Sequence, residues 1–140
     1  MGYWGKNKMF TKEHLQGILL SLTKPEIHVS RDSRLSIGYK VRLRLNFRGD
    51  ETFLKLLHET LNSYDVNCLY KKEEHKTRPR PILRISGMTN LIKTCGLLPH
   101  GLPDVKGDWV KFKEILALVD SGAHHTQEGL DRILEIKGEV

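Results

Sequence analysis

The 140-residue sequence lacks three features that would each assign it to a particular class of protein. Its two cysteines, Cys68 and Cys95, stand far apart without CxxC spacing, so we expect reduced core residues. No apolar run approaches the roughly 18–20 residues that a membrane-spanning helix needs. The first ten residues carry positive charge but no apolar core behind it, which argues against a secretory signal. We therefore expect an intracellular protein of the cytoplasm, nucleoid or an organelle matrix, with no membrane partner.

Acidic residues are also fewer than basic residues. Lys and Arg number 23 against 17 Asp and Glu, which gives a formal net charge of +6. A basic balance attracts polyanions, and nucleic acid is the commonest polyanion inside a cell. The length fits one domain. We expect an N-terminal arm over residues 1–10 and a single nucleic-acid-binding domain over residues 11–140.

The segment from Thr11 to Pro25 predicts a helix with apolar side chains in almost every direction. Thr11 can cap its start, and Pro25 disfavours helical geometry at the residue before it. A helix that is apolar nearly all round is normally buried or packed against a partner. Gly17 and Ser21 lie one turn apart on one face, where small residues let a second helix backbone approach closely.

The clearest strand runs from Gly38 to Phe47, where polarity alternates strictly. Such alternation predicts a half-buried strand with one face on a core. Its other face is a row of cations and an amide. Arg can contact guanine edges through two hydrogen bonds and Asn can do likewise with adenine, whereas Lys more often neutralises phosphate. We predict nucleic-acid contact for five residues, and the alternative is a solvated sheet face: Lys40, Arg42, Arg44, Asn46 and Arg48.

The rest of the chain completes an alternating order of helices and strands. Helices are predicted from Asp50 to about residue 63, over residues 88–95, from Asp108 to about 121, and from Thr126 to about 138. Strands are predicted from Glu26, over residues 66–71 and over residues 81–86. The resulting αββαββα order with two terminal helices indicates an α+β fold with an antiparallel sheet.

Four further polar residues would extend the cationic surface from the last two strands and the loop between them: Asn67, Lys71, Arg80 and Arg84. Arg84 is the strongest candidate of the four. The alternative for the connecting loop, KKEEHKTRPR, is a mobile hairpin tip.

Two stretches resemble the LAGLIDADG homing endonuclease family. Leu15 to Thr23 aligns without gaps with the family's nine-residue signature and keeps its opening Leu, its Gly, two aliphatic residues and a small residue at position seven. The tail, FKEILALVDSGAHHTQEGLDRILEIKG, is similar to the family's closing helices and their His-x-Thr-x-Glu-Gly-Leu turn. The resemblance implies two units that pair through their signature helices, with two sheets forming a saddle in the DNA major groove. The dimer interface would then include Gly17, Leu20 and Ser21.

The signature-like segment differs from the family at the two positions that are usually acidic and that serve cleavage. Positions six and eight are usually acidic, and the second holds the catalytic metal, but here they are Leu20 and Leu22. A divalent ion needs hard oxygen ligands, which Leu does not offer. We therefore predict no catalytic residue, no metal site and no required cofactor, with Mg²⁺ needed only if cleavage is retained. Glu26 is the alternative carboxylate for such cleavage.

The leading hypothesis is a nucleic-acid-binding protein, favouring double-stranded DNA, on a homing-endonuclease scaffold that has lost cleavage. Whether it is an enzyme stays open and leans toward no. The alternatives are an active metal-dependent site-specific endonuclease, an RNA-binding maturase-like or ribosome-associated component, and an interaction domain without nucleic acid. A homodimer or a second LAGLIDADG-like helix would supply the partner of the first helix. His124-His125 is interpreted as a helix-linking turn rather than as part of a zinc site with Cys95.

Overall fold

The computed structural model describes residues 9–77, 79–99 and 108–138. Nearly all of the expected arm over residues 1–10 therefore lies outside the described residues. The chain divides into two compact units, Met1–Lys24 with Leu45–Gly101, and Pro25–Arg44 with Leu102–Val140. No helix among the described residues combines the length and the apolar character needed to cross a membrane.

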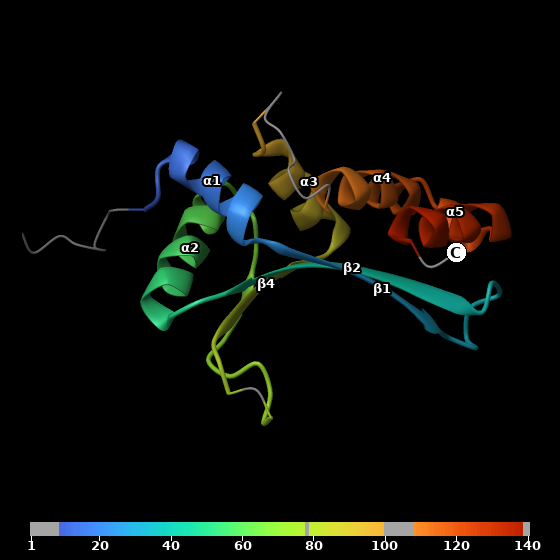
Figure 1. Cartoon of the computed structure of the whole chain (residues 1–140), viewed down its shortest axis with the longest axis horizontal. Coiled ribbons are helices and arrows are strands. Elements are labelled where there is room, and N and C mark those ends of the chain that lie inside the picture. Colours follow the sequence, from blue (N-terminus) through green and yellow to red (C-terminus); the bar gives the residue numbers. More distant parts are fainter. Residues whose placement is uncertain (1–8, 78, 100–107, 139–140) are drawn as a thin grey trace, which may run out of the picture. The chain divides into compact units, whose positions relative to one another are not determined.

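The first unit carries the signature-like helix. It contains α1 (Lys12–Leu22), α2 (Glu51–Ser63), β3 (Leu69–Lys71), β4 (Ile82–Ser86) and α3 (Met88–Gly96), shown in Figure 1. The side-chain amide of Gln16 donates to the carbonyl of Leu97 at 2.9 Å, which ties α1 to the end of α3. The core is formed by side chains that are at most 2% exposed: Leu15, Leu19, Leu45, Phe47, Leu54, Leu57, Leu61, Val66, Ile82, Leu83, Ile85 and Leu91.

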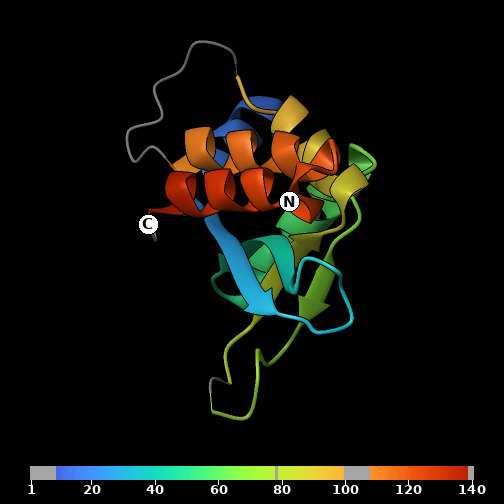
Figure 2. The same cartoon turned by 90° about the vertical axis from the view of Figure 1, so that its right-hand side faces the viewer.

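The second unit carries the two terminal helices. It contains most of β1 (Lys24–Arg31), α4 (Asp108–Asp120), the short 3₁₀ turn η1 (Ala123–His125) and α5 (Gln127–Lys137). Helices α4 and α5 lie side by side, as Figures 1 and 2 both show. Trp109 and Phe112 pack edge to face at 5.9 Å between ring centroids. A Cβ on Gly129 would lie 1.9 Å from the carbonyl oxygen of Ala123, so the turn before α5 accepts only glycine there.

A four-stranded sheet in the order β1-β2-β4-β3 joins these elements, and strand β2 (Tyr39–Arg48) contributes to both units. Strands β3 and β4 are antiparallel, with Leu69 opposite Arg84 and Lys71 opposite Ile82. The predicted α+β class and the αββαββα order are confirmed.

Two strands begin two or more residues away from their predicted starts. Strand β1 begins at Lys24 and includes Pro25, which an edge strand tolerates because its missing N–H costs no ladder bond there. Strand β3 begins at Leu69 rather than at residue 66. The preceding residues form the turn that ends α2, where Asp65 has a φ of 64° and the N–H of Val66 donates to Leu61.

Candidate nucleic-acid interface

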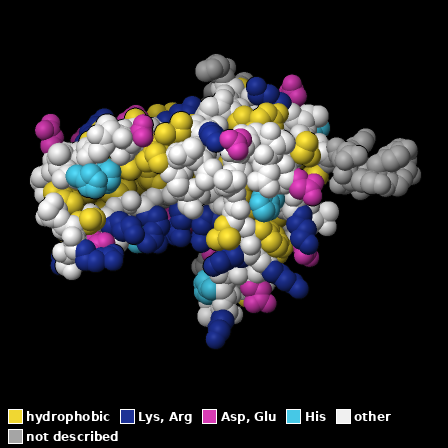
Figure 3. All heavy atoms as spheres, turned by 180° about the vertical axis from the view of Figure 1, so that it is seen from behind, with side chains coloured by type: hydrophobic (Ala, Val, Ile, Leu, Met, Phe, Trp, Pro, Cys, Tyr) yellow, Lys and Arg dark blue, Asp and Glu magenta, His cyan; other side chains and the backbone are white. Residues whose placement is uncertain are grey.

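Strand β2 places Lys40, Arg42, Arg44 and Arg48 on one face, because side chains two residues apart in a strand point the same way. We call these four side chains the cationic face of β2. Figure 3 shows Lys and Arg side chains gathered over the β1–β2 hairpin. Lys40 and Arg42 are exposed, and neither side chain forms a hydrogen bond or ion pair within the described residues. They are therefore available to an anion.

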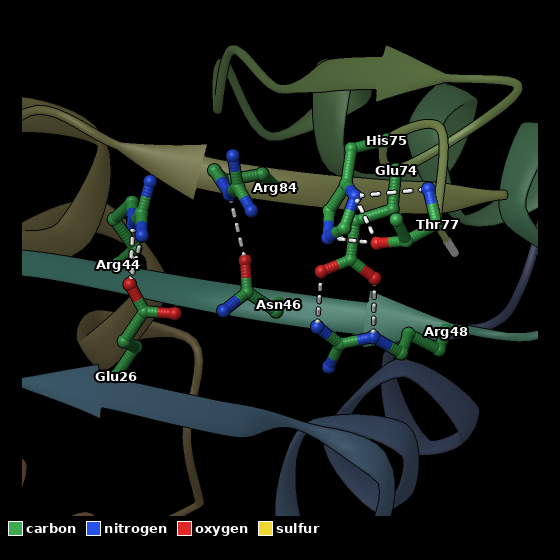
Figure 4. Close-up of polar contacts among 8 residues, drawn as sticks. All are labelled: Glu26, Arg44, Asn46, Arg48, Glu74, His75, Thr77 and Arg84. Atoms are coloured by element: carbon green, nitrogen blue, oxygen red, sulfur yellow. Dashed lines mark hydrogen bonds and ion pairs between the residues drawn. The ribbon is translucent and has the colours of Figure 1, made fainter. Parts of the chain in front are cut away.

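Arg44 is held by a carboxylate of the neighbouring strand. Its Nε donates to Glu26 Oε1 at 2.7 Å, and its Nη2 contacts the same oxygen (Figure 4). Both side chains are partly exposed. Glu26, the alternative carboxylate for cleavage, is thus engaged in an ion pair on the sheet.

Arg48 is held in a similar way at the other end of the face. Its Nε and Nη2 donate to the two carboxylate oxygens of Glu74, at 2.9 and 2.8 Å (Figure 4). This two-bond geometry fixes the plane of a guanidinium as well as its position. The N–H of Glu74 donates to the carbonyl of Arg80, which folds the connecting loop back on itself.

Arg84 contacts the side-chain amide of Asn46. Arg84 Nε donates to Asn46 Oδ1 at 2.8 Å, across neighbouring strands β4 and β2 (Figure 4). Asn46 is only 2% exposed, whereas Arg84 is half-buried. Asn46 was predicted to contact nucleic acid itself. In the structure its side chain is almost wholly buried, and its amide oxygen accepts the hydrogen bond from Arg84.

The other predicted contact residues are exposed: Asn67, Lys71 and Arg80. Lys71 lies in β3, two residues from Leu69, which is opposite Arg84 and 51% exposed. Asn67 lies before β3 and Arg80 before β4, so neither has its face defined by a strand. Glu26 and Glu74 were not predicted to hold arginines. In the sequence, the only indication of these ion pairs is that a few acidic residues accompany the excess of cations, and this indication is weak.

The open side of α1 carries the predicted interface residues. Leu15 and Leu19 are buried, while Gly17 and Ser21 are exposed and Leu20 is half-buried. A Cβ on Gly17 would meet no atom within 4 Å, and Ser21 Oγ donates to the Gly17 carbonyl at 2.6 Å. This side of the helix offers close approach to another helix backbone.

The C-terminal end of α1 does not suit a divalent cation. Leu20 and Leu22 stand where the family has acids, and Leu22 is 48% exposed. Among the described residues, no group of three or more His, Cys, Asp and Glu side chains could hold a metal ion. His124 and His125 lie in the turn η1, in keeping with the helix-linking interpretation. Burial raises the pKa of the Cys68 thiol to about 12, so it is a poor nucleophile.

The comparison of sequences identifies one curated relative but no family. No protein-family model matches the chain. A probable intron-encoded endonuclease 2 from Neurospora crassa is 28% identical over 115 residues, which cover 78% of this chain. The match spans only 24% of that longer relative.

Comparison with solved structures identifies the fold. The homing endonuclease I-TnaI matches with a TM-score of 0.76 at 23% identity, over 92% of this chain and 86% of that one. I-SmaMI, as a double mutant, matches with a TM-score of 0.78 at 21% identity, over 95% of this chain and 45% of its own. I-CpaMI, solved bound to uncleaved DNA, gives 0.73 at 20% identity, over 91% and 44%. The chain therefore has the fold of the LAGLIDADG homing endonucleases, as its first helix and closing turn predict.

Proposed function

We propose that the chain binds nucleic acid, with double-stranded DNA as the favoured polymer, through the cationic face of β2 and Arg84. The observation that carries the proposal is that this surface contains two kinds of cation, some without side-chain partners and some held in place by carboxylates. Lys40 and Arg42 are exposed without side-chain partners in the described part of the chain, while Arg44 and Arg48 are held by carboxylates. Free cations suit phosphate neutralisation, and oriented guanidinium groups suit base edges.

The solved relatives support this choice of polymer. I-SmaMI has been solved bound to cleaved DNA and to an uncleaved DNA target, and I-CpaMI bound to uncleaved DNA. That the region over residues 11–140 acts as one nucleic-acid-binding domain stays a prediction and forms part of this proposal.

We further propose that the scaffold binds without cleaving. Leu20 and Leu22 offer no oxygen ligand for a divalent ion, and Glu26 is engaged by Arg44. The expected result is no nicking of supercoiled plasmid in the presence of magnesium. Nicking that depends on magnesium and is lost in Glu26→Gln would instead establish an active endonuclease with an unusual carboxylate.

The open side of α1 supports pairing with a second unit of the same kind. The match to I-TnaI covers most of that chain, while the match to I-SmaMI covers under half of its chain. The partner helix would therefore belong either to a second copy of this chain or to a second unit of a longer one. Gly17, Leu20 and Ser21 would form the seam.

The binding proposal is tested by the salt dependence of affinity for a random-sequence duplex, measured by fluorescence anisotropy. Arg42→Ala is expected to weaken binding and to reduce the slope of log Kd against log salt by about one, as loss of one phosphate contact does. Lys113→Ala removes an exposed cation of α4 and serves as the matched control. Equal slopes for the wild type and both variants would remove β2 from the interface.

A competition experiment distinguishes duplex DNA from RNA as the preferred polymer. The labelled duplex is displaced with unlabelled duplex DNA or with structured RNA of matched length. Preferential displacement by duplex DNA is expected, because the cationic face of β2 consists of Lys and Arg and carries none of the aromatic side chains on which unstacked RNA bases stack. Preferential displacement by RNA would favour the maturase-like or ribosome-associated alternative.

A further inference from the structure

A pocket of about 480 Å³ lies within the second unit. Two segments far apart in the sequence line it. The β1–β2 hairpin contributes Asp32, Arg34, Leu35, Lys40 and Val41, and the turn η1 contributes His124 and His125. The volume falls within the range of small-ligand sites, roughly 300–1,000 Å³. Neither the predicted contact residues nor the paired-helix proposal gives the two histidines a role.

The charges of the lining favour an anion. Asp32 is the only acid among the lining residues, and its two oxygens accept from Arg34 Nε at 2.9 Å and Nη2 at 3.0 Å. Hydrogen bonds from Arg34, with a smaller contribution from the charge of Lys40, lower the pKa of Asp32 to about 2. The carboxylate is therefore compensated by its own neighbour. Two cations face one carboxylate, so the lining is positive even with neutral imidazoles.

The two imidazoles add ring nitrogens that form no hydrogen bond with the residues that the structure describes. Their ring centroids are 3.9 Å apart, and His124 Nδ1 is buried without a hydrogen-bond partner in the described structure. Burial, followed by the proximity of His125, lowers the pKa of His124. An anion against these rings would supply a hydrogen-bond acceptor and would offset their mutual repulsion when they are protonated.

We propose that this pocket binds a phosphodiester group of the nucleic-acid backbone. Phosphate oxygens accept hydrogen bonds from guanidinium, ammonium and imidazolium groups alike, and Leu35 and Val41 offer an apolar side to the sugar carbons. Lys40 lines the pocket and also belongs to the cationic face of β2, so the two surfaces are continuous. The assignment of the phosphate to a nucleic acid rests on the proposed function. The ability of the pocket to bind a phosphate group does not depend on it.

The first test uses inorganic phosphate as the probe and the histidine ring resonances as the readout. Phosphate replaces chloride at constant ionic strength while ¹³C-edited spectra are recorded on the full chain. Saturable shifts of His124 and His125 are expected, with an upward shift of the His124 pKa, while half-buried His58 of α2 stays unchanged. The variant His124→Gln should abolish the shift at His125. Uniform shifts at every histidine, or none, would overturn the proposal.

The second test separates backbone phosphate from free phosphate. Saturating duplex DNA is expected to shift the same two imidazoles, and the variant with both His124→Gln and His125→Gln should bind duplex about 3–10-fold more weakly at pH 6, as the loss of one phosphate contact implies. His58→Gln, on helix α2, is the matched control. Shifts with inorganic phosphate but none with bound duplex would overturn the backbone assignment.

The outcomes also separate this inference from the proposed function. Duplex binding that is sensitive to Arg42→Ala while both imidazoles stay unmoved rejects the pocket but keeps the cationic face of β2. Absence of any duplex binding rejects both.

Discussion

Asn46 Oδ1 accepts a hydrogen bond from Arg84 Nε at 2.8 Å, and the Asn46 side chain is almost wholly buried. A buried amide that holds a half-buried guanidinium can act on a bound polymer through that guanidinium. In the proposed interface Asn46 would therefore position Arg84, and Arg84 would make the contact.

A double-mutant cycle tests this relationship. Asn46→Ala and Arg84→Ala are each expected to weaken duplex binding, and the double variant should bind little worse than Arg84→Ala alone. The expected coupling is about 1 kcal/mol, the value of one hydrogen bond between neighbouring groups. Asn62→Ala, at an exposed position of α2, is the control and should change little. Additive losses would mean that Asn46 contributes independently of Arg84. Circular dichroism checks that each variant folds.

Glu74 is expected to restrain nonspecific binding by holding Arg48. In Glu74→Gln the guanidinium loses the charged oxygen of its two-bond partner, which leaves more of its positive charge to attract a phosphate. Affinity for a random duplex should rise about 2–5-fold and the salt slope should steepen by about one. Glu59→Gln, which removes an exposed acid from α2, controls for the change in net charge. Equal gains in the two variants would show that only total charge matters.

Local signals in the sequence predicted the helices well. Three helices have a side-chain cap at the residue where the sequence predicts their start, with Thr11 accepting from His14, Asp50 from Phe53 and Thr126 from Gly129, whereas Asp108, also predicted as a cap, is the first residue of α4 itself. Each cap depends on residues three apart, which a sequence shows directly. Strict alternation likewise identified β2, because one of its faces is on a core.

The arrangement of the site required information that no single segment contains. The partners of Arg44, Arg48 and Arg84 come from 18, 26 and 38 residues away. Which of them meet depends on the order β1-β2-β4-β3. Alternation placed Asn46 among the contact residues, but it could not reveal that Arg84 of the next strand would lie against it. Non-local pairing, not local propensity, decides which polar groups stay available.

Pairing through α1 is tested by enlarging its small side. Gly17→Leu should convert a dimer into a monomer in light scattering, because the added side chain would separate the two helix backbones. The monomer itself should tolerate the change, since a Cβ at this position meets no atom within 4 Å. Thermal unfolding of the variant supplies that control. An unchanged oligomeric state would reject Gly17 as part of a helix seam.

Gly129 is expected to be indispensable for the turn between α4 and α5. Gly129→Ala would bring a methyl group to 1.9 Å from the Ala123 carbonyl oxygen, so the turn must open. We expect a loss of about 1–3 kcal/mol in the free energy of unfolding, measured with urea. Gly96→Ala, where a Cβ meets no atom within 4 Å, is the matched control and should be neutral or stabilising. Equal effects in the two variants would contradict the steric argument.

The carboxylate partners of the arginines have a consequence for how such a protein changes its target over generations. Glu26 and Glu74 each restrain one guanidinium from a neighbouring segment. A single nucleotide change turns a glutamate codon into one for glutamine or lysine, which removes the carboxylate and leaves the arginine in place. In the proposed interface, the range of targets would therefore widen when the glutamate is lost and narrow again when it is restored, while every cation on β2 is inherited unchanged.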